Sequence, residues 1–277
     1  MHVDITTGAA RFLTAAEPFL RADPLRHTVM ATCVVSQLRN QSGGIRFLAL
    51  RDDAAAVTGI AQCTTDGRAY LAAVPPPGIP AVADALSALD GPLTCVEGPA
   101  ESVDAFLAHW SATTGGTHHP DYTARLYALN TPHQPTAPGE PRPATAADLA
   151  WCLRMTQEFA AETESTRGIS RAVAERQIEA GMWWLWEREG VASAFVARQT
   201  EAFGWARIGP VYTPPSARGN GYASALSAAV AARIRAEGAE VCLFADVANP
   251  TSNKIYRAIG FEAVCDFVNH RLVPASA

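Results

Sequence analysis

A proline-rich segment near the middle of the chain, residues 131–143, constrains the fold most strongly. Its sequence, TPHQPTAPGEPRP, holds five prolines and one glycine. Proline lacks a backbone N–H and restricts the residue before it, so this segment is not expected inside a helix or a sheet. We interpret it as a linker between two halves of ordinary domain size, residues 1–130 and residues 144–277.

The C-terminal half alternates between helical and strand patterns. The order is helix, helix, three strands, helix, strand, helix and strand, predicted at residues 148–162, 171–180, 183–187, 192–198, 205–212, 223–237, 241–246, 252–259 and 261–272. Such a mixture predicts an α/β or α+β layer fold with one mixed sheet. The N-terminal half shows a similar order with weaker signals, which indicates an internal structural repeat.

Composition excludes several classes of protein. The net charge is −5 and the pI about 5.8, which argues against a nucleic-acid binder. The six cysteines are scattered without zinc spacing, and the pair His118-His119 has no third ligand nearby, so we expect reduced thiols and no metal site. No leader-like N-terminus and no long apolar run is seen, so we expect a cytoplasmic protein with no membrane partner.

The segment GPVYTPPSARGNGYA, residues 209–223, carries the first chemical signal. A predicted strand ends near Tyr212, and Arg218-Gly-Asn-Gly-Tyr-Ala then leads into a helix. Glycines allow close backbone approach, and a helix N-terminus offers unpaired N–H donors, so this turn suits an anion. It is not a P-loop, because no Gly-Lys-Ser/Thr follows, and it departs from the dinucleotide fingerprint at Ser224. A plain glycine-rich turn is the alternative.

A second block, NPTSNKIYRAIGF at residues 249–261, follows the predicted strand 241–246. Together the two blocks resemble the R/Q-x-x-G-x-G/A loop and the N-x-x-S/A-x-x-x-Y-x-x-x-G-F block of the GCN5-related N-acetyltransferases (GNATs). The resemblance extends over about residues 142–272. It implies tandem GNAT-like folds, with a degenerate N-terminal lobe, because residues 74–80 (VPPPGIP) contain neither the arginine nor the G-x-G of the loop.

The resemblance also implies roles for individual residues. Tyr256 would be the general acid that protonates the leaving thiolate. The acetyl-CoA site would comprise the strand end, the loop and the second block, which are Val211, Tyr212, Thr213, Arg218, Gly219, Asn220, Gly221, Tyr222, Ala223, Asn249, Asn253 and Tyr256. A core aromatic is the alternative for Tyr256, since it is three residues from Ile259.

The general base is not identified by any pattern. Glu158 and Glu162 share a face of the first helix of the C-terminal half and are the leading candidates, although a solvated helix face is the better explanation for each of them. Glu187 and Asp246 are further candidates, and Asp246 could instead cap the next turn. The tryptophans at 183, 184, 186 and 205 fit sheet packing or an aromatic acceptor wall.

These features predict an acetyl-CoA-dependent N-acetyltransferase that acts on a primary amine of a small or amino-acid-like acceptor by direct attack. We expect a monomer or a homodimer. A non-catalytic acyl-CoA sensor, or an enzyme with a longer acyl donor, is the alternative.

Overall fold

The computed structural model describes residues 1–40, 44–163 and 168–275 and forms two compact units. Unit 1 comprises residues 1–126, 245–250 and 263–277, and unit 2 comprises residues 127–244 and 251–262. The units are therefore not two uninterrupted halves of the chain. The final strand, β12 (Phe261–Val273), lies mostly in unit 1, where its residues Phe267 to Arg271 pair antiparallel with β5.

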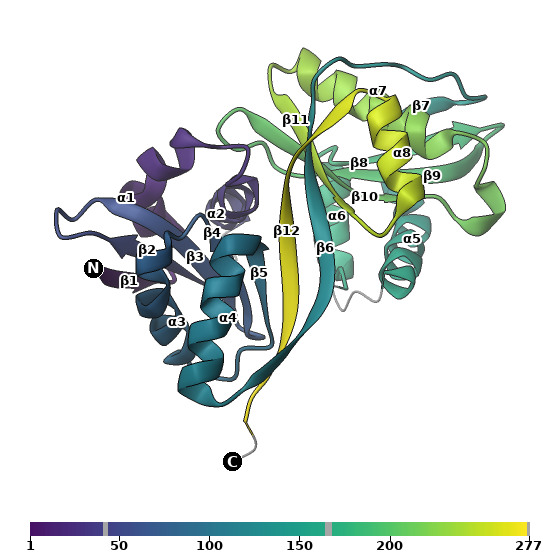
Figure 1. Ribbon diagram of the computed structural model, residues 1–277. Coiled ribbons are helices and arrows are strands. Elements are labelled where there is room, and N and C mark those ends of the chain that lie inside the picture. The colour runs from purple at the N-terminus through teal and green to yellow at the C-terminus, as the bar shows by residue number, and fades with distance from the viewer. Residues whose placement is uncertain (41–43, 164–167, 276–277) are drawn as a thin grey trace. The chain divides into compact units, whose positions relative to one another are not determined.

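Unit 1 is a mixed sheet with four helices (Figure 1). Its strand order is β1-β2-β3-β4-β5-β12-β6, and β4 and β5 are parallel. The strands besides β12 are β1 (His2–Thr6), β2 (Ile45–Arg51), β3 (Val57–Thr64), β4 (Arg68–Ala72), β5 (Cys95–Pro99) and β6 (Thr117–Leu129). The helices are α1 (Ala9–Ala22), α2 (Thr28–Asn40), α3 (Ile79–Ser87) and α4 (Ala100–Thr114), and a 3-10 turn, η1 (Pro76–Gly78), precedes α3.

Alternation along β2 explains how the helices cover this sheet. Phe47 stacks on Phe12 of α1 with ring centroids 4.8 Å apart. Its neighbours Leu48 and Leu50 are fully buried in a cluster with residues of α3 and α4. Successive side chains of a strand point to opposite faces, so α1 packs on one side of the sheet and α3 and α4 pack on the other.

Unit 2 repeats this plan. Its strand order is β11-β10-β9-β8-β7, and β10 and β11 are the parallel pair. The strands are β7 (Glu140–Pro143), β8 (Trp183–Arg188), β9 (Val191–Arg198), β10 (Trp205–Tyr212) and β11 (Glu240–Asp246). The helices are α5 (Leu149–Glu162), α6 (Arg171–Glu179), α7 (Tyr222–Ala236) and α8 (Pro250–Ala258), and the 3-10 turns are η2 (Ala146–Asp148) and η3 (Pro215–Ala217).

The tryptophans of β8 divide between the two faces as their spacing predicts. Trp183 is buried with α5 and α6 residues and meets Phe195 edge-on, with ring centroids 5.0 Å apart. Trp186 lies on the other face, where it stacks on Tyr222 at the start of α7. Its indole N–H donates to the carbonyl of Pro138 at 2.9 Å. These rings therefore fill the core of unit 2.

The predicted repeat of element order is confirmed. In both stretches of chain a strand and two helices precede three strands, a 3-10 turn, a helix, a strand, a helix and a strand. The prediction that the proline-rich segment avoids the sheet was wrong for its last four residues. Glu140 to Pro143 form β7, which pairs with β8 at the end of the strand order, and an edge strand tolerates prolines because one side needs no donors.

Two further expectations concern the whole chain. All six cysteines are free thiols, and burial raises the pKa of Cys63 to about 11 and of Cys152 to about 12. Of the helices within the described residues, none is both long and apolar enough to span a bilayer.

Candidate acyl-coenzyme A site

Strand β10 leaves its parallel neighbour before it ends. The ladder with β11 runs from Trp205 opposite Glu240 to Ile208 opposite Leu243. On its other side β10 stays paired with β9 as far as Tyr212, after a register shift between Ile208 and Val211. In the described pairings the backbone from 209 to 212 thus has one edge outside any ladder, and Val211 lies on this stretch.

The chain then turns through η3 into α7. Gly219 and Gly221 adopt left-handed φ values of +81° and +78°, which glycine accepts without the penalty of a Cβ. The space around Gly219 is open, since an added Cβ would have no heavy atom within 4 Å. The side-chain amide of Asn220 donates to the carbonyls of Ala217 and Arg218, at 3.1 and 3.2 Å, and so tightens the loop.

Six consecutive backbone N–H groups, those of residues 219–224, have no acceptor among the described residues. The first bond of α7 runs from the N–H of Ala225 to the carbonyl of Gly221, and no side chain caps the helix. Residues 218–221 are exposed to solvent. Unpaired donors at a helix N-terminus, where the helix dipole is positive, form an anion site.

The side chain of Arg218 is already paired. Its Nη2 atom lies 2.7 and 2.6 Å from the two carboxylate oxygens of Glu162, and its Nε donates to the carbonyl of Thr213 at 2.9 Å. The guanidinium also lies over the Tyr212 ring, 5.6 Å from the centroid. The structure thus gives Arg218 a clear role in shaping the loop, whereas its contact with a phosphate stays a prediction.

The two candidate bases differ in their surroundings. The Tyr212 hydroxyl donates to Glu162 at 2.7 Å, and this bond together with Arg218 lowers the pKa of Glu162. The same hydroxyl lies 3.3 Å from Glu158, which has only one other polar neighbour among the described residues, Arg154 at 3.8 Å. A single phenol proton cannot serve both carboxylates, so Glu158 is the less engaged of the two and the better candidate for a base.

The second block folds as the start of α8. Asn253 is buried, and its side-chain carbonyl accepts the Tyr127 hydroxyl at 2.7 Å. This bond anchors α8, and a coenzyme contact of Asn253 stays a prediction. The ring of Tyr256 is buried between Tyr127 and Phe261, as expected of a core aromatic, yet its hydroxyl bonds to no described residue. Burial raises the pKa of Tyr256, so the phenol keeps its proton at neutral pH.

Three other predicted residues make local structural contacts. Asn249 falls within unit 1, and its backbone N–H donates to the carbonyl of Asp246 at 3.0 Å. The carboxylate of Asp246 caps the following turn by accepting the N–H of Ala248 at 2.9 Å, which was the alternative to a catalytic role. Glu187 is bonded to Arg142, which lies on β7. The structure therefore favours structural roles for Asp246 and Glu187.

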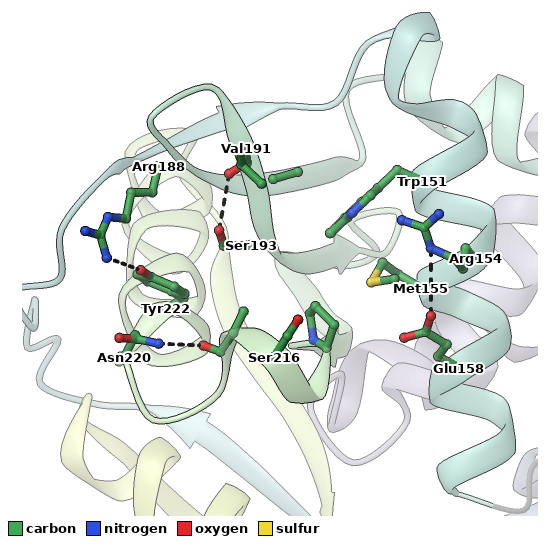
Figure 2. Close-up of a pocket in the computed structure, with 13 residues that line it drawn as sticks. Trp151, Arg154, Met155, Glu158, Arg188, Val191, Ser193, Ser216, Asn220 and Tyr222 are labelled. Carbon is green, nitrogen blue, oxygen red and sulfur yellow. Dashed lines mark hydrogen bonds and ion pairs between the residues drawn. The ribbon is translucent and has the colours of Figure 1, made fainter.

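A pocket of about 560 Å³ opens beside the end of β10 (Figure 2). It is bounded by α5, the β8–β9 hairpin and the loop before α7. The lining residues are Trp151, Arg154, Met155, Glu158, Arg188, Val191, Ala192, Ser193, Pro214, Ser216, Ala217, Asn220 and Tyr222. None of the four tryptophans singled out in the sequence is among them. The aromatic residues of the lining are instead Trp151 and Tyr222.

The sequence predicted only one of the four α5 residues that line this pocket, Glu158. The other three are Trp151, Arg154 and Met155. Their spacing of three, four and seven residues places them on one face of α5. That spacing was the available signal, but it is equally typical of a buried helix face. Only the packing of the hairpin and the loop opposite α5 makes this face a wall of a pocket.

Comparisons with known proteins bear on this geometry. Residues 185–271 match the family described as FR47-like protein, while no curated protein matches the chain. Two solved GNAT structures match over nearly their whole length. One is a GNAT-family acetyltransferase from Colwellia psychrerythraea, 13% identical with a TM-score of 0.60, covering 99% of this chain and 100% of that one. The other is a tandem GNAT protein from the clavulanic acid biosynthesis pathway, 13% identical with a TM-score of 0.59, covering 100% and 99%.

The chain has the tandem GNAT fold. A Drosophila protein of known structure shares this architecture with a TM-score of 0.73 at 14% identity, covering 99% of each chain. At these identities the likeness establishes the fold and leaves the reaction to the residues of the site.

The GNAT fold of unit 2 presents groups that fit an acyl-coenzyme A. The six free N–H donors suit a pyrophosphate, and the stretch of β10 beyond its ladder offers backbone groups to an amide-bearing arm. The hydroxyl of Thr213, at the start of the loop, is buried without a hydrogen-bond partner among the described residues. A buried hydroxyl without a partner is costly, so a ligand at this position would satisfy it.

Proposed function

We propose that unit 2 binds acetyl-CoA along the end of β10 and the loop before α7 and transfers the acetyl group to the primary amine of a small molecule. The observation that carries the proposal is the run of six unpartnered N–H groups at residues 219–224, beside a strand that has left its ladder. These groups would hold the pyrophosphate and the pantetheine arm of the coenzyme. The coenzyme supplies an activated thioester.

In the proposed reaction the amine nitrogen attacks the thioester carbon and the carbon–sulfur bond breaks. Glu158 accepts the proton that the amine loses, directly or through water, and Tyr256 protonates the leaving thiolate. Two observations support these roles. Glu158 lines the pocket beside the end of β10, and the buried Tyr256 hydroxyl bonds to no described residue and keeps its proton at neutral pH, so it is free to donate. A positioned acid or base contributes about 10²- to 10⁴-fold to such a step.

The substitution Tyr256→Phe tests the role of the acid. It removes only the hydroxyl, so we expect kcat for thiol release to fall by about 10²-fold or more while the Kd for acetyl-CoA stays within about twofold. Thiol release over an amine panel gives kcat, and calorimetry gives Kd. Tyr122→Phe, which removes a phenol of unit 1, is the matched control and should leave both unchanged.

Three outcomes separate the proposal from its alternatives. An unchanged kcat in the Tyr256→Phe protein would remove Tyr256 as the acid. Tight acetyl-CoA binding with no thiol release for any amine would identify a sensor instead of an enzyme. Faster release from a longer acyl-CoA would reassign the donor.

A further inference from the structure

The pocket beside β10 has an ordered set of chemical groups along one face of α5. Trp151, Arg154 and Glu158 follow one another over two turns of the helix, and all three line the pocket (Figure 2). The Arg154 and Glu158 side chains are 60% and 38% exposed, so both groups can reach a ligand. The sequence of groups from one end of the wall to the other is aromatic, cationic and anionic.

Neither charged group of this face is strongly engaged within the described residues. Nε of Arg154 and a carboxylate oxygen of Glu158 are 3.8 Å apart, which is longer than a hydrogen bond. The Tyr212 hydroxyl lies 3.3 Å from Glu158 but only 2.7 Å from Glu162. An exposed ion pair of this kind contributes at most about 1 kcal/mol, so a ligand with complementary charges can replace it at small cost.

Part of the remaining lining is apolar. Met155, Val191, Ala192 and Pro214 supply hydrocarbon and thioether surface. A second guanidinium, that of Arg188, lies at the opposite rim and is held by the Tyr222 hydroxyl at 3.3 Å. The pocket thus combines an apolar patch beside Trp151 with one carboxylate and two guanidiniums, a balance that favours a ligand with at least one anionic group.

We propose that this pocket binds the acceptor, and that the acceptor is a hydrophobic α-amino acid or a close analogue with a free amine and a carboxylate. The proposal rests on the transfer reaction proposed above. The side chain of the ligand packs on Trp151, its carboxylate pairs with Arg154, and its amine lies at Glu158. Glu158 is next to Tyr212 at the end of β10, so this orientation presents the amine to the strand that holds the thioester.

The test compares pairs of acceptors that differ only by the carboxylate. L-Phenylalanine, L-leucine and L-methionine are each set against the amine that lacks the carboxyl group: phenethylamine, isoamylamine and 3-(methylthio)propylamine. Thiol release from acetyl-CoA is the readout. We expect kcat/KM for at least one amino acid to exceed that of its amine by about tenfold or more, as expected for loss of a charge-assisted contact.

Two variants locate the effect. Arg154→Gln should lower kcat/KM for the amino acid about tenfold and leave the decarboxylated amine within about twofold, which removes the preference. Arg171→Gln is the matched control, because Arg171 begins a similar exposed pair with Glu175 on α6 at 3.5 Å and does not line the pocket. It should leave the preference intact.

Several results would overturn this assignment. Amines that react as well as their amino acids, or a panel in which no amino acid reacts, would exclude the acceptor class. Calorimetry with acetyl-CoA separates this failure from failure of the coenzyme site, since binding would persist in the first case only. If Arg154→Gln weakens acetyl-CoA but not its 3′-dephospho form, the pocket serves the coenzyme phosphate and the acceptor assignment is wrong.

Discussion

Each unit has a loop with a 3-10 turn that connects a strand to a helix at the same point of the topology: β4 to α3 in unit 1 and β10 to α7 in unit 2. The two loops differ in how many free backbone N–H groups they offer. In unit 1 the loop after β4 has no free donor from residue 75 to residue 80. Four of these six residues are prolines, and the N–H groups of Gly78 and Ile79 donate to the carbonyls of Pro75 and Pro76. In unit 2 the six residues from 219 to 224 all keep their N–H groups free within the described structure.

The glycines of the two loops differ in the same way. Gly78 is buried, and a Cβ there would lie 2.1 Å from Cδ2 of Leu50, so this glycine serves packing. Gly219 faces open space with a left-handed φ, so it serves backbone conformation. The same fold can therefore carry a loop with free N–H donors and open space, or a loop whose prolines and tight packing leave room for neither. We infer that unit 1 has no counterpart of the proposed coenzyme site.

The substitution with the largest expected effect makes the unit 2 loop resemble that of unit 1. Pro80 is the second residue of α3, and Ala223 is the second residue of α7. Ala223→Pro removes one free N–H while the first turn of a helix tolerates proline. A hydrogen bond to a charged group contributes about 1.5–3 kcal/mol, so we expect the Kd for acetyl-CoA to rise roughly 10- to 150-fold in calorimetry.

Ala172→Pro controls for the effect of a proline at the second position of a helix. It changes the corresponding residue of α6, whose N–H also precedes the first helical bonds. Both variants should keep the thermal stability of the parent within a few degrees. If Ala223→Pro binds acetyl-CoA as tightly as the control, the free donors of α7 do not hold the coenzyme.

Gly78→Ala is the converse change, made in unit 1. Leu50 is fully buried, so it cannot easily move away from a new methyl group. Overpacking of this kind costs about 1–3 kcal/mol, and we expect a lower unfolding midpoint in urea with no change in the Kd for acetyl-CoA. Weaker coenzyme binding in this variant would show that the loop of unit 1 takes part in the site.

Gly219→Ala should affect binding more modestly. A non-glycine residue in the left-handed region costs roughly 1 kcal/mol, and Gly204 provides a matched control with φ +84° and equally open space. We expect both alanine variants to lose similar stability, and only Gly219→Ala to raise the Kd for acetyl-CoA, by about fivefold. Equal Kd values for the two variants would contradict a coenzyme contact at this glycine.

Local patterns predicted much of this molecule. Strand and helix spacing placed α7 at residues 223–237, and the structure has it at Tyr222–Ala236. The alternation along β8 separated Trp183 from Trp186 correctly. Such features depend on neighbours within a few residues, which a sequence displays directly. That four of the residues from 75 to 80 cannot donate was equally visible, because proline has no N–H wherever it lies.

Features that depend on distant partners were not predictable. Arg218 meets Glu162, which lies 56 residues earlier, and nothing in either segment announces the pair. The wall that Trp151 and Arg154 form becomes a pocket only when the β8–β9 hairpin packs opposite them. The assignment of most of β12 to unit 1 likewise depends on its pairing with β5, which lies far away in the chain.

The smallest expected effect concerns the ion pair between Arg218 of the unit 2 loop and Glu162. The loop of unit 1 contains no arginine that could form such a pair. Glu162→Gln keeps an acceptor for Tyr212 but removes the charge that holds Arg218. Because such exposed pairs contribute about 0.2–1 kcal/mol, we expect the Kd for acetyl-CoA to rise no more than about fivefold. Calorimetry between pH 4 and pH 8 measures the difference between the variant and the parent.

The pH dependence of that difference identifies its cause. Hydrogen bonding to Tyr212 and pairing with Arg218 lower the pKa of Glu162 below its ordinary value of about 4.3, so the parent keeps the charge throughout the neutral range. The advantage of the parent should be constant above about pH 5 and shrink as the pH falls through the lowered pKa, where the carboxyl group becomes neutral like glutamine. If the Glu162→Gln variant binds acetyl-CoA more tightly than the parent, Glu162 does not help binding by positioning the loop. It then competes with the coenzyme phosphate for Arg218.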